Sequence, residues 1–112
     1  MVDITVWKDL KGNITGLEIK GHAGYADYGS DIVCAAVSAL AETAILGIKK
    51  IAVVNANTVK KEGLVRIEIP EVMPEENRYR VNIILRTITV GLEDIAKTYP
   101  EYVRLVCKEE NL

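Results

Sequence analysis

Two side chains of this sequence could act together on a carbonyl group. His22 is the only histidine, and Cys34 is one of two cysteines. A cysteine nucleophile needs a stabilised thiolate and a nearby base, which a histidine can supply. A helix that begins just before Cys34 would favour the thiolate through its dipole and free N–H groups. The pair therefore predicts acyl transfer through a thioester, in which His22 takes the thiol proton and later protonates the leaving amine.

The segment between these two residues has the composition of a loop, rich in glycine, tyrosine and aspartate. Glycine adopts backbone conformations that are closed to other residues, and loops of this kind often order over a bound substrate. A plain connector has the same composition. We expect a substrate loop in which the tyrosines form apolar walls and the aspartate meets a basic residue; its members are Gly21, Gly24, Tyr25, Asp27, Tyr28 and Gly29.

A helix is predicted from this loop to about Lys50, with Ser30 or Asp31 as its cap. Its apolar stripe should pack on a sheet and comprises Val33, Ala36, Val37, Leu40, Ala44 and Ile48. Cys34 lies off this stripe, on the side of Ser38. Ser38 could steady the thiolate or the substrate, or simply allow close packing, and Asp31 could orient His22 or only cap the helix. Free N–H groups of the first turn are expected to form the oxyanion hole.

The rest of the chain predicts two β-hairpins, a second helix and a last strand. The strands are expected at residues 2–8, 17–20, 51–59, 64–69 and 102–107, and the second helix from Pro74 to Pro100, although residues 81–90 are β-branched enough for a strand. Cys107 is interpreted as packing material. The order ββαββαβ predicts an α+β fold with two layers, in which a mostly antiparallel sheet carries both helices on one face.

Length and charge limit the possible functions. A chain of 112 residues predicts a single domain, residues 1–112, that needs neither a disulfide nor a metal for stability. Its 14 basic and 16 acidic residues give a net charge of -2, which offers no basic field for direct nucleic-acid binding. The start, MVDITVWKDL, has no secretory pattern, so we expect a cytoplasmic protein with free thiols and no membrane span.

Two motifs carry a resemblance to a known family. Gly21-His22-Ala23 and the run from Gly29 to Ser38, GSDIVCAAVS, resemble the Prp family of ribosomal-processing cysteine proteases, and the similarity extends over essentially the whole chain. The resemblance implies a cytoplasmic endopeptidase, active as a homodimer without a cofactor, that removes an N-terminal extension from a large-subunit ribosomal protein. It also implies that His22 and Cys34 are the catalytic pair and that Asp31 and Ser38 support them.

Other classes of protein fit the residues less well. A redox-sensing thiol protein could pair Cys34 with Cys107, but nothing in the sequence places them together. A zinc site lacks closely spaced ligand pairs, so no metal is expected. Gly21 to Gly24 matches the GxxG of RNA-clamping domains, but follows a strand in an acidic chain. A ribosome-associated binding module with an inert cysteine is the remaining alternative.

Overall fold

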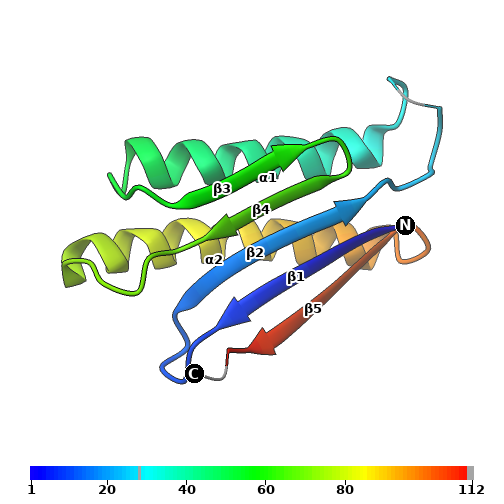
Figure 1. Cartoon of the computed structure of the whole chain (residues 1–112). Helices are drawn as coiled ribbons and strands as arrows, with labels where there is room; N and C mark the ends of the chain where they lie inside the picture. The colour runs from blue at the N-terminus through cyan, green and yellow to red at the C-terminus, as the bar shows by residue number, and fades with distance from the viewer. Residues whose placement is uncertain (28, 111–112) are drawn as a thin grey trace.

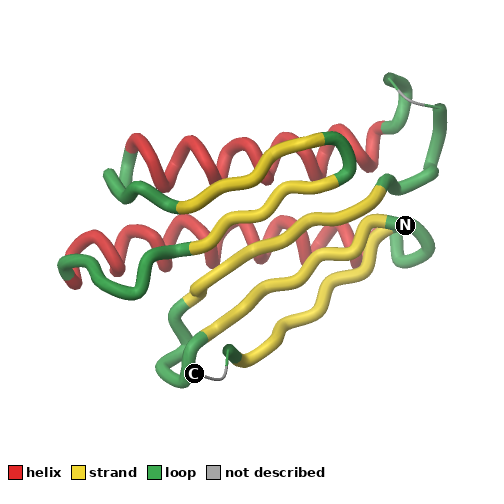
Figure 2. Tube along the Cα trace, in the orientation of Figure 1, coloured by secondary structure: helices red, strands yellow, loops and turns green. Residues whose placement is uncertain are grey.

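The chain folds into two layers, a five-stranded sheet and a pair of helices that cover one of its faces (Figures 1 and 2). The computed structural model describes residues 1–27 and 29–110. Tyr28, which the sequence assigns to the substrate loop, lies outside the described residues. The elements are β1 (Val2–Lys8), β2 (Ile14–Gly21), α1 (Ile32–Lys50), β3 (Asn57–Lys61), β4 (Leu64–Glu68), α2 (Glu75–Thr98) and β5 (Val103–Glu109). The predicted order and layering are confirmed.

The sheet is mixed, with strand order β3-β4-β2-β1-β5. The pairs β1 with β2, β2 with β4 and β3 with β4 are antiparallel, whereas β1 and β5 are parallel. The parallel pair follows from the connection, because α2 carries the chain back along the sheet and β5 must then run in the direction of β4. The sheet is therefore mostly antiparallel, as predicted, with one parallel edge.

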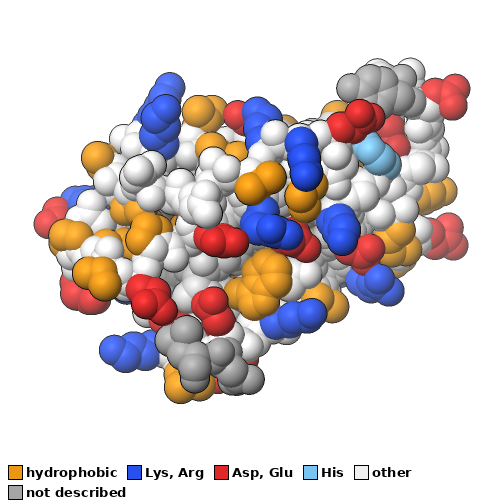
Figure 3. Space-filling model, viewed as in Figure 1, with side chains coloured by type: hydrophobic (Ala, Val, Ile, Leu, Met, Phe, Trp, Pro, Cys, Tyr) orange, Lys and Arg blue, Asp and Glu red, His pale blue; other side chains and the backbone are white. Residues whose placement is uncertain are grey.

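Alternation along β1 separates the two faces of the sheet. Val2, Ile4 and Val6 are buried beneath the helices, while the residues between them lie on the open face. Figure 3 views this open face, on which acidic and basic side chains surround apolar ones. The strand bounds predicted at residues 2–8 are confirmed.

The helices pack on the sheet and on each other, with one correction to the predicted stripe of α1. Ala36 is exposed, and Ala41 takes its place in the core. In α2 the β-branched segment remains helical because its apolar positions recur at helical spacing and are buried at Val81, Leu85 and Ile88. A Cβ at Gly91 would lie only 3.1 Å from Cδ1 of Leu40, so this glycine allows α1 and α2 to approach closely.

By length and composition α1 could also cross a membrane. Core helices of soluble proteins pass the same test, and here the apolar stripe of α1 packs in the core between sheet and helices. The outward side of α1 carries Glu42, which forms an ion pair with Lys60 of β3.

The predicted strand at residues 51–59 is wrong over residues 51–56. Ile51 and Ala52 instead complete the end of α1, since both donate their backbone N–H groups to the carbonyl oxygen of Gly47. The chain then turns, with Val53 at a positive φ of 54°, and pairs with β4 only from Asn57 onwards. An apolar, β-branched composition had favoured a strand here, but the backbone hydrogen bonds of the helix end took precedence.

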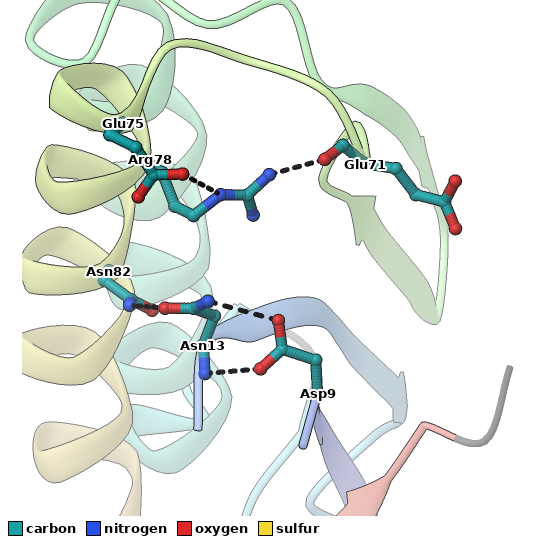
Figure 4. Close-up of polar contacts among 6 residues, drawn as sticks. All are labelled: Asp9, Asn13, Glu71, Glu75, Arg78 and Asn82. Carbon is teal, nitrogen blue, oxygen red and sulfur yellow. Dashed lines mark hydrogen bonds and ion pairs between the residues drawn. The ribbon is translucent and has the colours of Figure 1, made fainter. Parts of the chain in front are cut away.

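At the end of the sheet where β1 turns into β2, Asp9 fixes the turn and α2 is tied to it (Figure 4). The Asp9 carboxylate accepts from the backbone N–H groups of Lys11 and Asn13 and from the Asn13 side chain. Asn82 of α2 bonds both the Asn13 side chain and the N–H of Ile14. Burial acts to raise the pKa of Asp9, but the Asn13 and Lys11 hydrogen bonds and the Arg78 charge hold it below 3.8.

Candidate active site

Cys34 lies in the first turn of α1, where the loop from β2 returns to the helix. Its side chain is half-buried, and the backbone N–H of Ala23 donates to its Sγ atom at 3.1 Å. Ala23 is itself buried and follows His22 directly. The sulfur thus sits at a helix N-terminus and accepts a hydrogen bond from the segment that carries the histidine, an arrangement suited to a thiolate.

Asp31 joins the loop to the helix. Its Oδ1 atom caps α1 by accepting from the N–H groups of Val33 and Cys34, at 3.0 and 2.9 Å. Its Oδ2 atom accepts from the N–H groups of Tyr25 and Ala26, at 3.0 and 3.4 Å. The hydrogen bonds from Cys34, Ala26 and Tyr25 lower the pKa of Asp31 against the opposing effect of burial. The capping interpretation is confirmed, and the bonds of this carboxylate in the described part of the chain go to the loop and helix rather than to His22.

His22 is exposed at the end of β2, between the chain start and the β3–β4 turn. Its carbonyl oxygen accepts from the N-terminal amine of Met1 at 2.7 Å, and Gly21 donates to the carbonyl of Gly63 at 2.9 Å. A Cβ built on Gly63 would lie 3.4 Å from Nε2 of His22, so the imidazole rests against this turn. Among the residues that the structure describes, no hydrogen bond connects the ring to Cys34 Sγ, and the ring must move to reach the sulfur.

The expected oxyanion hole in the first turn of α1 is not free. The N–H groups of Val33 and Cys34 are bound by the Asp31 carboxylate, and that of Ala35 donates to the Asp31 carbonyl oxygen at 3.0 Å. The prediction overlooked that a cap side chain with two oxygens can take several first-turn donors. The backbone donor that bonds the Cys34 sulfur is instead the N–H of Ala23.

Tyr25 anchors the loop to the far side of the site. Its ring makes edge contacts with Tyr99 and Tyr102, at centroid distances of 5.7 and 5.2 Å. Gly24, just before it, has φ of 72°, which a proline could not adopt. The other described members of the expected substrate loop, Asp27 and Gly29, are exposed. The loop is therefore held at Tyr25 and at Asp31, and its described residues between these two are exposed.

Ser38 and Cys107 are both exposed. Ser38 is exposed one turn further along α1. Cys107 is exposed on β5, so its interpretation as packing material is wrong. It pairs with Val6, roughly 13 Å along β1 from the Val2 end where the site lies, too far for a disulfide with Cys34. Among the described residues no three His, Cys, Asp or Glu side chains converge as metal ligands would.

Comparison with known proteins identifies the family. The model of the cysteine protease Prp family matches residues 1–104. The chain belongs to the Prp family of cysteine proteases. The ribosomal processing cysteine protease Prp of Staphylococcus aureus is 32% identical over 104 residues, covering 93% of this chain and 94% of the relative. The Prp of Bacillus subtilis is 27% identical over 107 residues, which cover 94% of this chain and 96% of the relative.

Solved Prp structures share the fold. The S. aureus Prp in complex with a covalently linked product peptide has a TM-score of 0.88 at 27% identity, covering 96% of this chain and 100% of that one. A second S. aureus Prp complex, with a substrate peptide, has a TM-score of 0.82 at 26% identity over the same shares. This chain is thus a Prp-family cysteine protease, of a family that processes ribosomal proteins.

Sequence reasoning missed the contacts of four residues near the site. The N–H of Ala23 has no side-chain signal at all. Gly63 is recognisable as a turn residue, but its position beside His22 requires the β2–β4 pairing, which the sequence does not fix. The contacts of Tyr25 with Tyr99 and Tyr102 join segments more than 70 residues apart.

Proposed function

We propose that this protein is an endopeptidase that removes the N-terminal extension of a large-subunit ribosomal protein, with Cys34 as nucleophile and His22 as general base and acid. The membership of the Prp family supports this reading. The observation that carries it is the hydrogen bond from Ala23 N–H to Cys34 Sγ, which brings the histidine segment to the sulfur at the start of α1.

The reaction begins when substrate binding moves the His22 ring from Gly63 towards Cys34. His22 accepts the thiol proton, and Sγ attacks the carbonyl carbon of the scissile peptide bond. The Ala23 N–H then lies next to the developing oxyanion and is the donor we assign to it. Collapse of the intermediate breaks the C–N bond while His22 returns its proton to the leaving amine, which leaves a thioester on Cys34.

Deacylation uses the same two side chains. Water gives a proton to His22 and its oxygen attacks the thioester carbonyl, so the new N-terminal fragment leaves as a carboxylic acid. The proton on His22 then restores the Cys34 thiol. In this scheme Asp31 holds the loop through Tyr25 and Ala26 and also contacts the side chain of Cys34, and Ser38 is assigned a supporting role one turn behind the sulfur.

We further propose that residues 1–112 act as one protease domain, in the cytoplasm and as a homodimer. A dimer is implied by the family resemblance. It is also supported by large apolar side chains that are exposed on the uncovered side of the helix layer, which are Ile32, Leu46, Ile83 and Val90. Analytical ultracentrifugation of the purified protein tests this part directly.

The decisive experiment is to incubate the protein with the extended ribosomal protein and to sequence the new N-terminus. Cleavage at one site, lost in Cys34→Ala, is the expected result. Cleavage that persists in Cys34→Ala would exclude the thiol mechanism, and an intact precursor after prolonged incubation with the wild-type protein would exclude the substrate.

A further inference from the structure

A groove on the open face of the sheet lies at the opposite end of β2 from the catalytic pair. It has a volume of about 470 Å³ and is formed where β1, β2 and β4 meet the end of β5; its lining includes Trp7, Thr15, Gly16, Glu18, Arg66, Glu68 and Glu109. Gly16 keeps the groove open, because a Cβ there would lie 3.3 Å from Cε3 of Trp7. The indole of Trp7 therefore forms one wall of the groove, beside the backbone of Gly16.

The groove is acidic. Its lining holds four glutamates and a single arginine. Arg66 is already neutralised by Glu18, to which it donates two hydrogen bonds at 2.9 and 2.7 Å. Glu68 and Glu109 form no ion pair with any residue that the structure describes. Lys108 is the neighbour of Trp7 on β5 but lies outside the lining.

A buried hydroxyl in the same groove lacks a partner. Oγ1 of Thr15, a lining residue, is buried without a hydrogen bond to any described group. A buried polar atom of this kind costs free energy in the folded protein. The aromatic wall and the unpaired carboxylates together fit a donor-rich cation, since ammonium and guanidinium groups bind both ring faces and carboxylates.

We propose that this groove binds a lysine- or arginine-rich segment of the ribosomal-protein substrate, as a second contact remote from the scissile bond. The inference rests on the proposed function, and ribosomal proteins are rich in such segments because they bind RNA phosphates. From Gly16 to Gly21 the strand β2 spans roughly 17 Å at 3.3 Å per residue. An extended substrate needs at least about five residues between the scissile bond and the basic segment to reach both places.

Trp7 allows a direct test, because it is the only tryptophan of the chain. A peptide of alternating lysine and glycine is titrated into the protein while the fluorescence of Trp7 is recorded. We expect a saturable change that weakens as salt is added and is absent with a glutamate–glycine peptide of the same length. In Glu68→Gln/Glu109→Gln the dissociation constant should rise roughly fivefold. A control, Glu93→Gln/Asp94→Asn on the exposed side of α2, removes the same charge elsewhere and should bind as wild type.

The same variants separate this inference from the proposed function. With the full-length precursor, Glu68→Gln/Glu109→Gln should raise KM by a similar factor and leave kcat unchanged, whereas a peptide that ends two residues after the scissile bond should be cleaved normally. If wild-type protein cleaves neither substrate, the proposed function fails while the titration still decides the groove. A fluorescence response that is missing, equal for both peptides, or unchanged in the double variant would overturn the proposal. Should the double variant unfold by circular dichroism, Glu68→Gln alone replaces it.

Discussion

Asp9 and Asp31 stand at opposite ends of β2 and use the same device with different results. Each accepts backbone N–H groups, and each has a pKa below the usual value. The bonds of Asp9 stay within one turn, which Asn82 of α2 then fixes by side-chain contacts (Figure 4). Asp31 gives one oxygen to a helix and the other to a loop. Because its two oxygens bond different segments, the Asp31 carboxylate can release the loop while it still caps the helix. The turn around Asp9 has only a structural role and needs no such release.

The largest effect is expected when one of the two proposed catalytic side chains is removed and the bonds of Asp9 and Asp31 are kept. Cys34→Ala and His22→Ala should each lower kcat/KM by a factor on the order of 10⁴ or more, because nucleophile and base act as a unit. Circular dichroism and the melting temperature should stay close to wild type. Substantial turnover by either variant would end the assignment of the pair.

The next prediction tests the role of one Asp31 oxygen, which bonds the loop, while the cap made by the other oxygen is kept. Asn is as good a helix cap as Asp, but its amide group cannot accept from Tyr25 and Ala26. Asp31→Asn should therefore keep α1 intact and lower kcat/KM roughly tenfold to a hundredfold through misplacement of the loop. Asp9→Asn is the matched control and should leave the kinetics unchanged. Equal losses of kcat/KM in the two variants would contradict the different roles assigned to Asp9 and Asp31.

A several-fold effect is expected from the aromatic anchor of the loop. Tyr25→Ala removes the contacts with Tyr99 and Tyr102 and should free the loop, so that iodoacetamide reaches Cys34 faster than in wild type. The measurement needs a Cys107→Ser background because Cys107 is exposed. Tyr25→Phe keeps the ring and should label at the wild-type rate. Stiffening the loop by Gly24→Pro is not an alternative test, because the φ of 72° at Gly24 is closed to proline. A slower reaction in Tyr25→Ala would show that the loop guides the reagent instead of covering the thiol.

The smallest effect concerns stability. Asp9→Ala removes three hydrogen bonds and should lower the free energy of unfolding by about 1 kcal/mol at neutral pH, with activity retained. The folded-state pKa of Asp9 lies below 3.8, so its contribution is complete above that pH and is lost as pH falls through the lower folded-state value. Urea unfolding at pH 7 and pH 3 should thus show a smaller difference between variant and wild type at pH 3. A difference that grows in acid would contradict the hydrogen bonds assigned to this carboxylate.

Local patterns were sufficient for most of the fold. The alternation of Val2, Ile4 and Val6, the cap at Asp31 and the proline before α2 each act over a few residues, and the elements they predicted are present. The prediction was wrong at residues 51–56 because the end of a helix competes for the same backbone groups as a strand. It was wrong at Ala36 because the buried face of α1 follows Val33, Val37, Ala41, Ala44 and Ile48, and Ala36 lies to one side of it.

Residue types predicted the helix cap and proposed His22 and Cys34 as the pair, but they did not predict the resting geometry of this region. The bond from Ala23, the position of the imidazole over Gly63 and the anchor of Tyr25 depend on strand pairing and on contacts across the whole chain. Such contacts produce no repeating pattern of residue types in the sequence, because each joins backbone groups or single side chains from distant segments.

The parallel pairing of β1 with β5 has a consequence for synthesis of the protein. Residues 2 to 8 can form a hairpin with β2 as soon as they emerge from a ribosome, but their other edge stays open until residues 103–109 arrive. Contacts of such sequence separation form late in folding. Tyr99 and Tyr102 arrive with the same segment, so a nascent chain carries His22 and Cys34 before it has the anchor for its loop. Proteolytic activity should therefore appear only when synthesis is nearly finished. A chain still attached to the ribosome would then not act as a protease.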